Sequence, residues 1–184
     1  MPASLTSALL LALLLGAVLT DLHARRIPNA LVLAGTTLAL AAHTLSLAGS
    51  HPPLAGADWW APLSGLATGL AVLMPLYLLR AMGAGDVKLM AMVGAFVGAP
   101  TVLMAALYTL LAGGLLSLAM MFGQGVAART LANVRFVLTE WAMRLRSGHG
   151  SLTLGAAPLQ TTAARLPYAL AIAVGTVAAL VQAY

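Results

Sequence analysis

The sequence contains no cysteine, and only 7% of its 184 residues are charged. The missing cysteine excludes disulfides, zinc ribbons and thiol catalysis within this chain. Ordinary soluble domains carry about a quarter of charged residues, so a charge content this low excludes a conventional soluble domain. Acidic residues are the scarcest charged class, with 4 Asp and Glu against 9 Lys and Arg.

Apolar and small residues make up most of the remaining sequence. The chain is 61% hydrophobic and contains 18 glycines. Small residues let helices approach closely in lipid, where no hydrophobic drive brings them together. We therefore predict an integral membrane protein whose partner is the lipid bilayer. The formal charge of +5 is expected to record topology, and nucleic acid is not an expected partner.

Six apolar runs are candidates for membrane spans. They are Ala3 to Leu22, Ala30 to Leu47, Pro62 to Leu79, Val87 to the Gly98-Ala99-Pro100 stretch, Thr101 to Phe122, and Leu166 to Tyr184. The fourth run is short, since roughly a dozen residues rise only about 20 Å. Glycine and proline punctuate the chain at its end, so two helices are expected in place of one long helix from Val87 to Phe122.

Every basic residue falls on one side of this six-span arrangement, and the positive-inside bias identifies that side as the cytoplasm. These residues are Arg25, Arg26, Arg80, Lys88, Arg129, Arg135, Arg144, Arg146 and Arg165. The segment from Val126 to Arg146 has apolar residues at alternating steps of three and four, which predicts an amphipathic helix on the cytoplasmic interface. The expected fold is all-α: a single polytopic membrane domain over residues 1–184, with six transmembrane helices plus this cytoplasmic amphipathic helix and both termini outside.

Two aspartates border apolar sequence on the cytoplasmic side. Asp21 ends the first span, and Asp86 begins the fourth within Gly83-Ala84-Gly85-Asp86-Val87-Lys88. A charged side chain at membrane depth is a functional-site hypothesis by default. Two carboxylates at close range cannot both ionise, so the pair is expected to titrate as a coupled dyad and to work as general base and general acid. Gly83 and Gly85 lack a Cβ atom and would allow a sharp backbone path and an extended substrate nearby.

Simpler interpretations exist for each aspartate. Asp21 could form an interfacial ion pair with Arg25 or Arg26, and Asp86 could cap the N-terminus of its helix. The occurrence of both carboxylates on one side of the membrane favours catalysis over these interpretations. No metal or cofactor is expected, because no convincing ligand cluster is present.

Four stretches, taken in order, resemble the type IV prepilin peptidases. They are Asp21 with Arg26-Ile27-Pro28-Asn29, Gly83 to Leu89, Val93 to Gly98, and Leu166-Pro167-Tyr168-Ala169. The second contains the Gly-x-Gly-Asp motif of intramembrane aspartic proteases. The resemblance implies that Asp21 and Asp86 are the catalytic pair of an aspartic endopeptidase. It implies that the substrate is a prepilin or pseudopilin, whose basic leader peptide is cut at the cytoplasmic face of a bacterial inner membrane.

Larger family members carry an additional region with paired Cys-x-x-Cys motifs and also methylate the new N-terminus. This chain starts at its first span and has no cysteine. It resembles the short enzymes of tight-adherence, or Flp-type, pilus systems, and methyltransferase activity is not expected. Lys88 matches a lysine of the family and would tune the dyad or contact the substrate. A topological anchor is an equally good interpretation of Lys88.

Two other functions remain open from the residues alone. In one, Asp21 and Asp86 form a proton or cation site of a membrane transport component. In the other, the chain is a structural subunit of a secretion machine. Cleavage of a leader peptide that depends on both aspartates would distinguish the peptidase from both alternatives.

Overall fold

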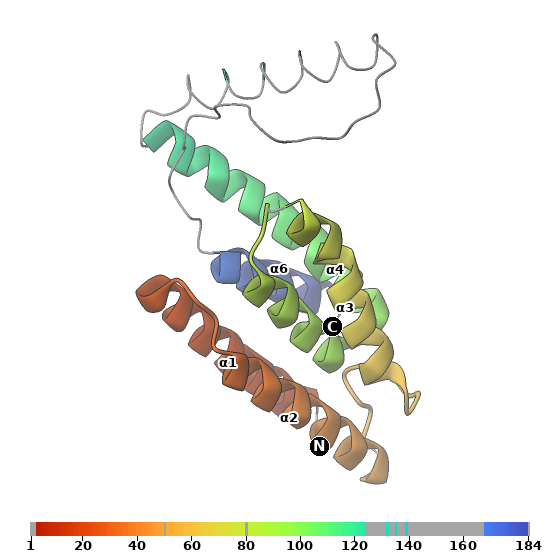
Figure 1. The fold of residues 1–184 in the computed structure, drawn as a ribbon. Helices are drawn as coiled ribbons and strands as arrows, with labels where there is room; N and C mark the ends of the chain where they lie inside the picture. Colours follow the sequence, from red (N-terminus) through yellow and green to blue (C-terminus); the bar gives the residue numbers. More distant parts are fainter. Residues whose placement is uncertain are drawn as a thin grey trace. The chain divides into compact units, whose positions relative to one another are not determined.

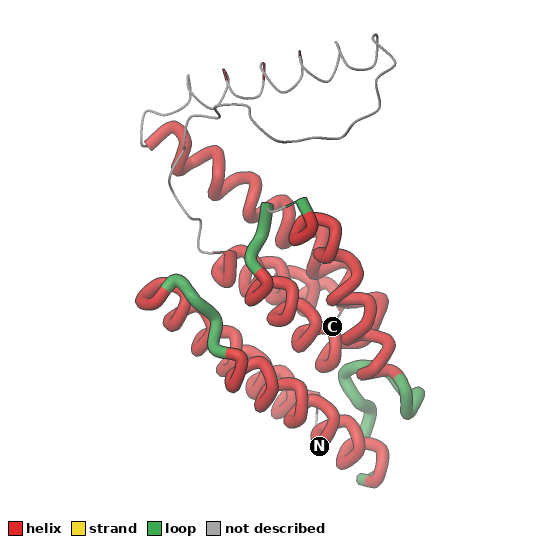
Figure 2. Tube along the Cα trace, viewed as in Figure 1, coloured by secondary structure: helices red, strands yellow, loops and turns green. Residues whose placement is uncertain are grey.

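The computed structural model describes residues 3–49, 51–79, 81–123 and 168–183, together with single positions at 132, 135 and 139. These residues form helices joined by short loops, so the predicted all-α class is confirmed for this part of the chain (Figure 2). The predicted amphipathic segment from Val126 to Arg146 lies almost entirely outside the described residues.

Five helices follow one another in the described chain (Figure 1). Their bounds are α1 Ala3–Ala24, α2 Asn29–Ala48, α3 Ala61–Leu78, α4 Ala84–Gly123 and α6 Tyr168–Ala183. The first four are long and apolar enough to cross a membrane, whereas α6 is a shorter apolar helix of 16 residues. The ends of α1, α2 and α3 lie within two residues of the predicted bounds because the apolar runs and their Gly and Pro borders are local features of the sequence.

The helix α4 consists of two helical segments that meet at Gly98. This glycine has φ 78° and ψ 171°, which are not helical values. The predicted division between the fourth and fifth runs is therefore confirmed, and a single straight helix from Val87 to Phe122 is not. We call residues 84–97 the first segment of α4 and residues 99–123 the second segment.

The first segment of α4 is the buried centre of this part of the chain. Every residue from Leu89 to Gly98 is buried. The first segment is therefore surrounded by other residues on all sides from Leu89 onward. Its partner α3 comes very close, since a Cβ atom on Gly65 would overlap the carbonyl oxygen of Gly94, and one on Gly69 would overlap the carbonyl oxygen of Met90. These two pairs run in opposite order along the chain, so α3 and the first segment are antiparallel.

The last helix, α6, packs against α1 and against the second segment of α4. The contact with α1 is extensive, and α1 also packs against α2. Gly175 of α6 lies against Thr109 of α4, and Gly113 of α4 lies against the ring of Tyr168. The opposite order of these pairs makes α6 and the second segment antiparallel. The start of α6 lies near the end of α1, because the Ala169 N–H bonds to the Asp21 carboxylate.

Candidate active site

Asp21 lies in the last turn of α1, and its carboxylate reaches the start of α6. The backbone N–H of Ala169 donates a hydrogen bond to Asp21 Oδ2 at 3.3 Å. Ala169 is fully buried, and Asp21 is partly buried. The first N–H groups of a helix have no partner within the helix and favour a negative charge. The start of α6 therefore holds the Asp21 carboxylate in place.

Asp86 is the third residue of α4, and its side chain folds back over the start of the helix. The N–H of Gly83 donates a hydrogen bond to Asp86 Oδ2 at 3.2 Å. This is the bond that an acidic residue makes in the first turn of a helix when it closes a capping box. The simpler interpretation of Asp86 as a cap of its helix agrees with this bond, although Asp86 is the third residue of α4 and not its N-cap. The bond fixes the position of the carboxylate without removing it from the site.

The two carboxylates come from different helices and are brought together. Asp21 lies close enough to Asp86 for their negative charges to act on each other. Arg25 and Arg26 are exposed, and within the described residues neither forms an ion pair with Asp21. When one of two interacting carboxyl groups is ionised and the other is protonated, the first can act as a base and the second as an acid.

The turn between α1 and α2 touches the start of α4 at two points. Ile27 lies beside Gly85, where an added Cβ atom would come within 3.3 Å of the Ile27 Cβ. The ammonium group of Lys88 donates a hydrogen bond to Asn29 Oδ1 at 3.1 Å. The turn and the first residue of α2 therefore contact α4 at positions before and after Asp86.

Three of these contacts were not predicted from the sequence. No role was assigned to Asn29, to Ile27 or to the backbone of Ala169. A signal was present, because all three residues lie in stretches that resemble the prepilin peptidases. The predicted site residues Asp21, Gly83, Gly85, Asp86 and Lys88 all lie at one end of their helices, which we call the Asp21 end.

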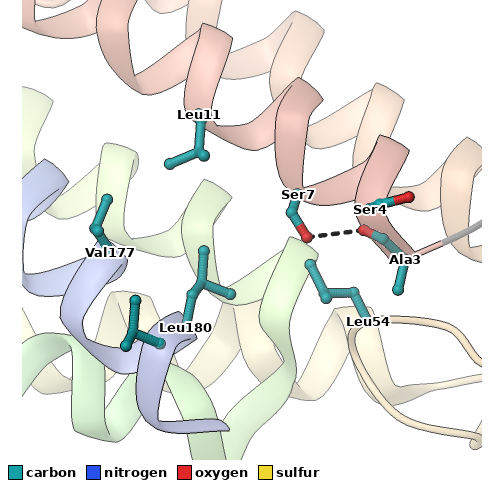
Figure 3. A pocket seen from close by; sticks show the side chains of 8 residues that line it. Ala3, Ser4, Ser7, Leu11, Leu54, Val177 and Leu180 are labelled. Carbon is teal, nitrogen blue, oxygen red and sulfur yellow. Dashed lines mark hydrogen bonds between the residues drawn. The ribbon is translucent and has the colours of Figure 1, made fainter. Parts of the chain in front are cut away.

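A cavity of about 360 Å³ lies at the opposite end of α1 (Figure 3). Its lining is Ala3, Ser4, Ser7, Leu11, Leu54, Val177, Leu180 and Val181. Ser7 donates its hydroxyl to the Ala3 carbonyl at 2.7 Å, as the dashed line in Figure 3 shows. From Ser7 to Asp21, α1 rises about 20 Å, so this cavity is separate from the carboxylate pair.

The described residues contain no group of three His, Cys, Asp or Glu side chains that could hold a metal ion. The groups available at the Asp21 end include two carboxyl groups, the ammonium group of Lys88, the exposed side chains of His23, Arg25 and Arg26, and backbone N–H donors.

Comparison with known proteins identifies a protein family. A sequence model of the type IV leader peptidase family matches residues 8–118, which is more than half of the chain and includes both Asp21 and Asp86. No curated protein and no solved structure matches. The family match confirms the resemblance to this family. Three of the four sequence stretches lie within the matched residues, and Leu166 to Ala169 lies outside them.

Proposed function

The chain belongs to the type IV leader peptidase family, and from this premise we propose that it is an intramembrane aspartic endopeptidase with Asp21 and Asp86 as its catalytic pair. One observation carries the proposal. Two carboxylates from distant parts of the chain lie close enough for their charges to interact, and each accepts a hydrogen bond from a backbone N–H at the start of a helix.

The proposed chemistry is hydrolysis of a peptide bond by a general base and a general acid. The ionised aspartate removes a proton from a water molecule, and the resulting hydroxide attacks the carbonyl carbon of the scissile bond. The protonated aspartate donates its proton to the carbonyl oxygen. When the tetrahedral intermediate collapses, the leaving amine takes the proton that the base removed from water, and a hydroxyl group of the intermediate returns its proton to the second aspartate as the carbonyl re-forms. Both carboxyl groups end the cycle with one shared proton.

The proposed substrate is a prepilin-like or pseudopilin-like protein whose basic leader peptide is cut before its apolar helix. This follows from the family and from the position of the pair, because a peptide bond next to an apolar helix would be presented at the boundary of the bilayer. Substrates of the tight-adherence (Flp) type and the lack of methyltransferase activity are finer parts of the proposal. They rest on the sequence resemblance described above.

The proposed topology has six spans, with the Asp21 end at the cytoplasmic face of a bacterial inner membrane. Its support is that α1, α2, α3, the two segments of α4, and α6 alternate in direction. Arg25, Arg26 and Lys88 all lie at the Asp21 end, and the exposed Trp59 lies in the loop before α3 at the other end. Basic residues favour the cytoplasmic side, and tryptophan favours a membrane interface. The segment from Val126 to Arg146 is proposed as the cytoplasmic amphipathic helix.

The test is cleavage by the purified protein in liposomes. The substrate is a synthetic peptide with a basic leader, a glycine and an apolar segment, and the products are identified by mass spectrometry. Asp21→Asn and Asp86→Asn should each lower kcat by at least a hundredfold, because an amide can neither accept nor supply the proton. A metal chelator should leave the rate unchanged.

Asp58→Asn is the matched control. Asp58 is exposed in the loop before α3. Its two described hydrogen bonds, with His43 Nε2 at 3.0 Å and from the Ala61 N–H at 3.0 Å, both use its backbone carbonyl and not the carboxylate. This variant should cleave at the wild-type rate. Normal leader removal by both Asp21→Asn and Asp86→Asn would refute the proposed function.

A further inference from the structure

The residues that follow Asp21 in the chain make the turn that contacts the start of α4. The helix α1 ends at Ala24, and Arg25 closes it in the left-handed region with φ 51°. Pro28 then has φ −63° and ψ 131° and leads into α2. Proline restricts both its own φ and the conformation of the residue before it. Ile27 is thus held in a constrained turn, shortly after one carboxylate.

Ile27 occupies the space that Gly85 leaves open. A Cβ atom on Gly85 would lie 3.3 Å from Ile27 Cβ and 3.7 Å from both Cγ1 and Cδ1. The first of these distances is tighter than an ordinary side-chain contact, so the neighbour would have to move by a few tenths of an ångström. Ile27 also packs against the buried core, which limits how far it can move. Gly85 directly precedes Asp86.

A second contact, between Lys88 and Asn29, also holds the start of α4. Lys88 Nζ donates to Asn29 Oδ1 at 3.1 Å, which joins the first turn of α4 to the first turn of α2. Both side chains are exposed, and interactions between exposed groups contribute little by themselves. The apolar contact of Ile27 with Gly85 therefore carries most of the positioning, and the Lys88–Asn29 bond supports it.

We propose that Ile27 and Gly85 are a size-matched pair that sets the position of Asp86 relative to Asp21. In this proposal Gly85 lacks a side chain to accommodate Ile27, and its role is not to make room for the substrate. Both are positioning residues, since they act through Asp86. The catalytic part of the inference rests on the proposed function, whereas the contact itself can be tested without any substrate.

The first experiment enlarges the residue at position 85, shortens the side chain at position 27, and measures cleavage kinetics in liposomes. Gly85→Ala should lower kcat by about tenfold with KM changed less than twofold, since misplacement of a catalytic group by 1 Å can lower the rate by roughly a hundredfold. Adding Ile27→Val removes Cδ1, which would lie 3.7 Å from the added Cβ, so that the shorter side chain can move away from the 3.3 Å contact at its own Cβ. It should restore at least half of the lost rate. Gly114→Ala is the control, because an added Cβ there meets nothing within 4 Å.

The second experiment measures the thermal unfolding midpoint of the same variants. Ile27→Val alone should lower the midpoint, because it removes a methyl group from a packed side chain. In the Gly85→Ala background the same substitution should raise the midpoint. Ile27→Val is expected to lower the midpoint in the wild-type protein and raise it in the Gly85→Ala protein only if the side chains at positions 27 and 85 compete for the same space.

The outcomes separate the inference from the proposed function. If the wild-type protein cleaves no leader peptide but the change of sign is found, the proposed function fails and the contact stands. If Gly85→Ala raises KM and Ile27→Val restores nothing, Gly85 serves the substrate and the inference is wrong. If the unfolding midpoints show the change of sign but kcat does not recover with them, the contact is structural only and the positioning role is refuted.

Discussion

Replacing Gly98 with alanine tests the division of α4 into two helical segments. In the structure Gly98 has φ 78° and ψ 171°, a combination that is essentially restricted to glycine. An added Cβ atom would also overlap the carbonyl oxygen of Ala55 in the loop before α3. That oxygen belongs to the backbone and cannot turn aside as the end of a flexible side chain could. Gly98→Ala should therefore destabilise the protein in two ways.

The expected loss of stability follows from these two effects. A residue forced into a sparsely populated backbone region costs about 1–3 kcal/mol, and overpacking of a close contact costs about 1–3 kcal/mol. A single shift of the backbone near residue 98 can partly relieve both the unfavourable dihedral angles and the overlap with Ala55. We therefore expect a loss of about 2–4 kcal/mol in the free energy of unfolding, which is less than the full sum. For a chain of this length each kcal/mol shifts the unfolding midpoint by about 2–4 °C, which makes the expected decrease roughly 5–15 °C.

The assay is thermal unfolding of the purified protein in detergent micelles, followed by circular dichroism. Gly114→Ala in the second segment of α4 is the matched control, because an added Cβ there meets no atom within 4 Å. In a helix interior alanine is more favourable than glycine by up to about 1 kcal/mol. The control should therefore unfold at the wild-type temperature or a few degrees above it.

The two substitutions are expected to have opposite signs. If α4 were one continuous helix, Gly98→Ala would stabilise the protein, just as Gly114→Ala does. An equal or higher unfolding midpoint for Gly98→Ala would thus refute the break at Gly98. It would also remove the support for two separate spans in this part of the chain.

Two further predictions concern helix packing and use the same unfolding assay. Gly65→Ala should lower the unfolding midpoint well below that of Gly16→Ala. An added Cβ at Gly65 would overlap the Gly94 backbone, whereas one at Gly16 would meet a side-chain carbon at 3.4 Å. Equal midpoints would contradict the close approach of α3 and α4. Tyr108→Phe should cost about 1 kcal/mol through loss of its hydrogen bond to Gln182, and it should have no effect in a Gln182→Leu background if this bond is its only contribution.

Local features of the sequence were sufficient to predict the helices. Apolar runs, their Gly and Pro borders and the position of basic residues depend on neighbouring positions along the chain, so the bounds of α1, α2 and α3 could be predicted closely. The break at Gly98 was predicted for the same reason, since Gly98, Ala99 and Pro100 are adjacent. Asp21 and Asp86 stood out because carboxylates are rare in apolar sequence.

The buried centre could not be predicted in the same way. In a water-soluble protein, burial can be read from the contrast between apolar and polar residues. In a membrane protein, side chains that face lipid and side chains that face the core are both apolar. Leu89 is fully buried and Leu103 is 47% exposed, although both are leucines in the same helix α4. Only the packing of α3, α6 and the two segments of α4 decides between these environments.

The sequence by itself determined the class of protein, the helices and the two candidate catalytic carboxylates. The tertiary structure decided what lies beside those carboxylates: the Ala169 N–H at Asp21, and the contact of Ile27 with Gly85 next to Asp86. The physical reason is that a backbone donor carries no signature in the residue type, and a glycine looks the same whether a substrate or a neighbouring isoleucine fills its space. Such contacts exist only after distant segments have packed together.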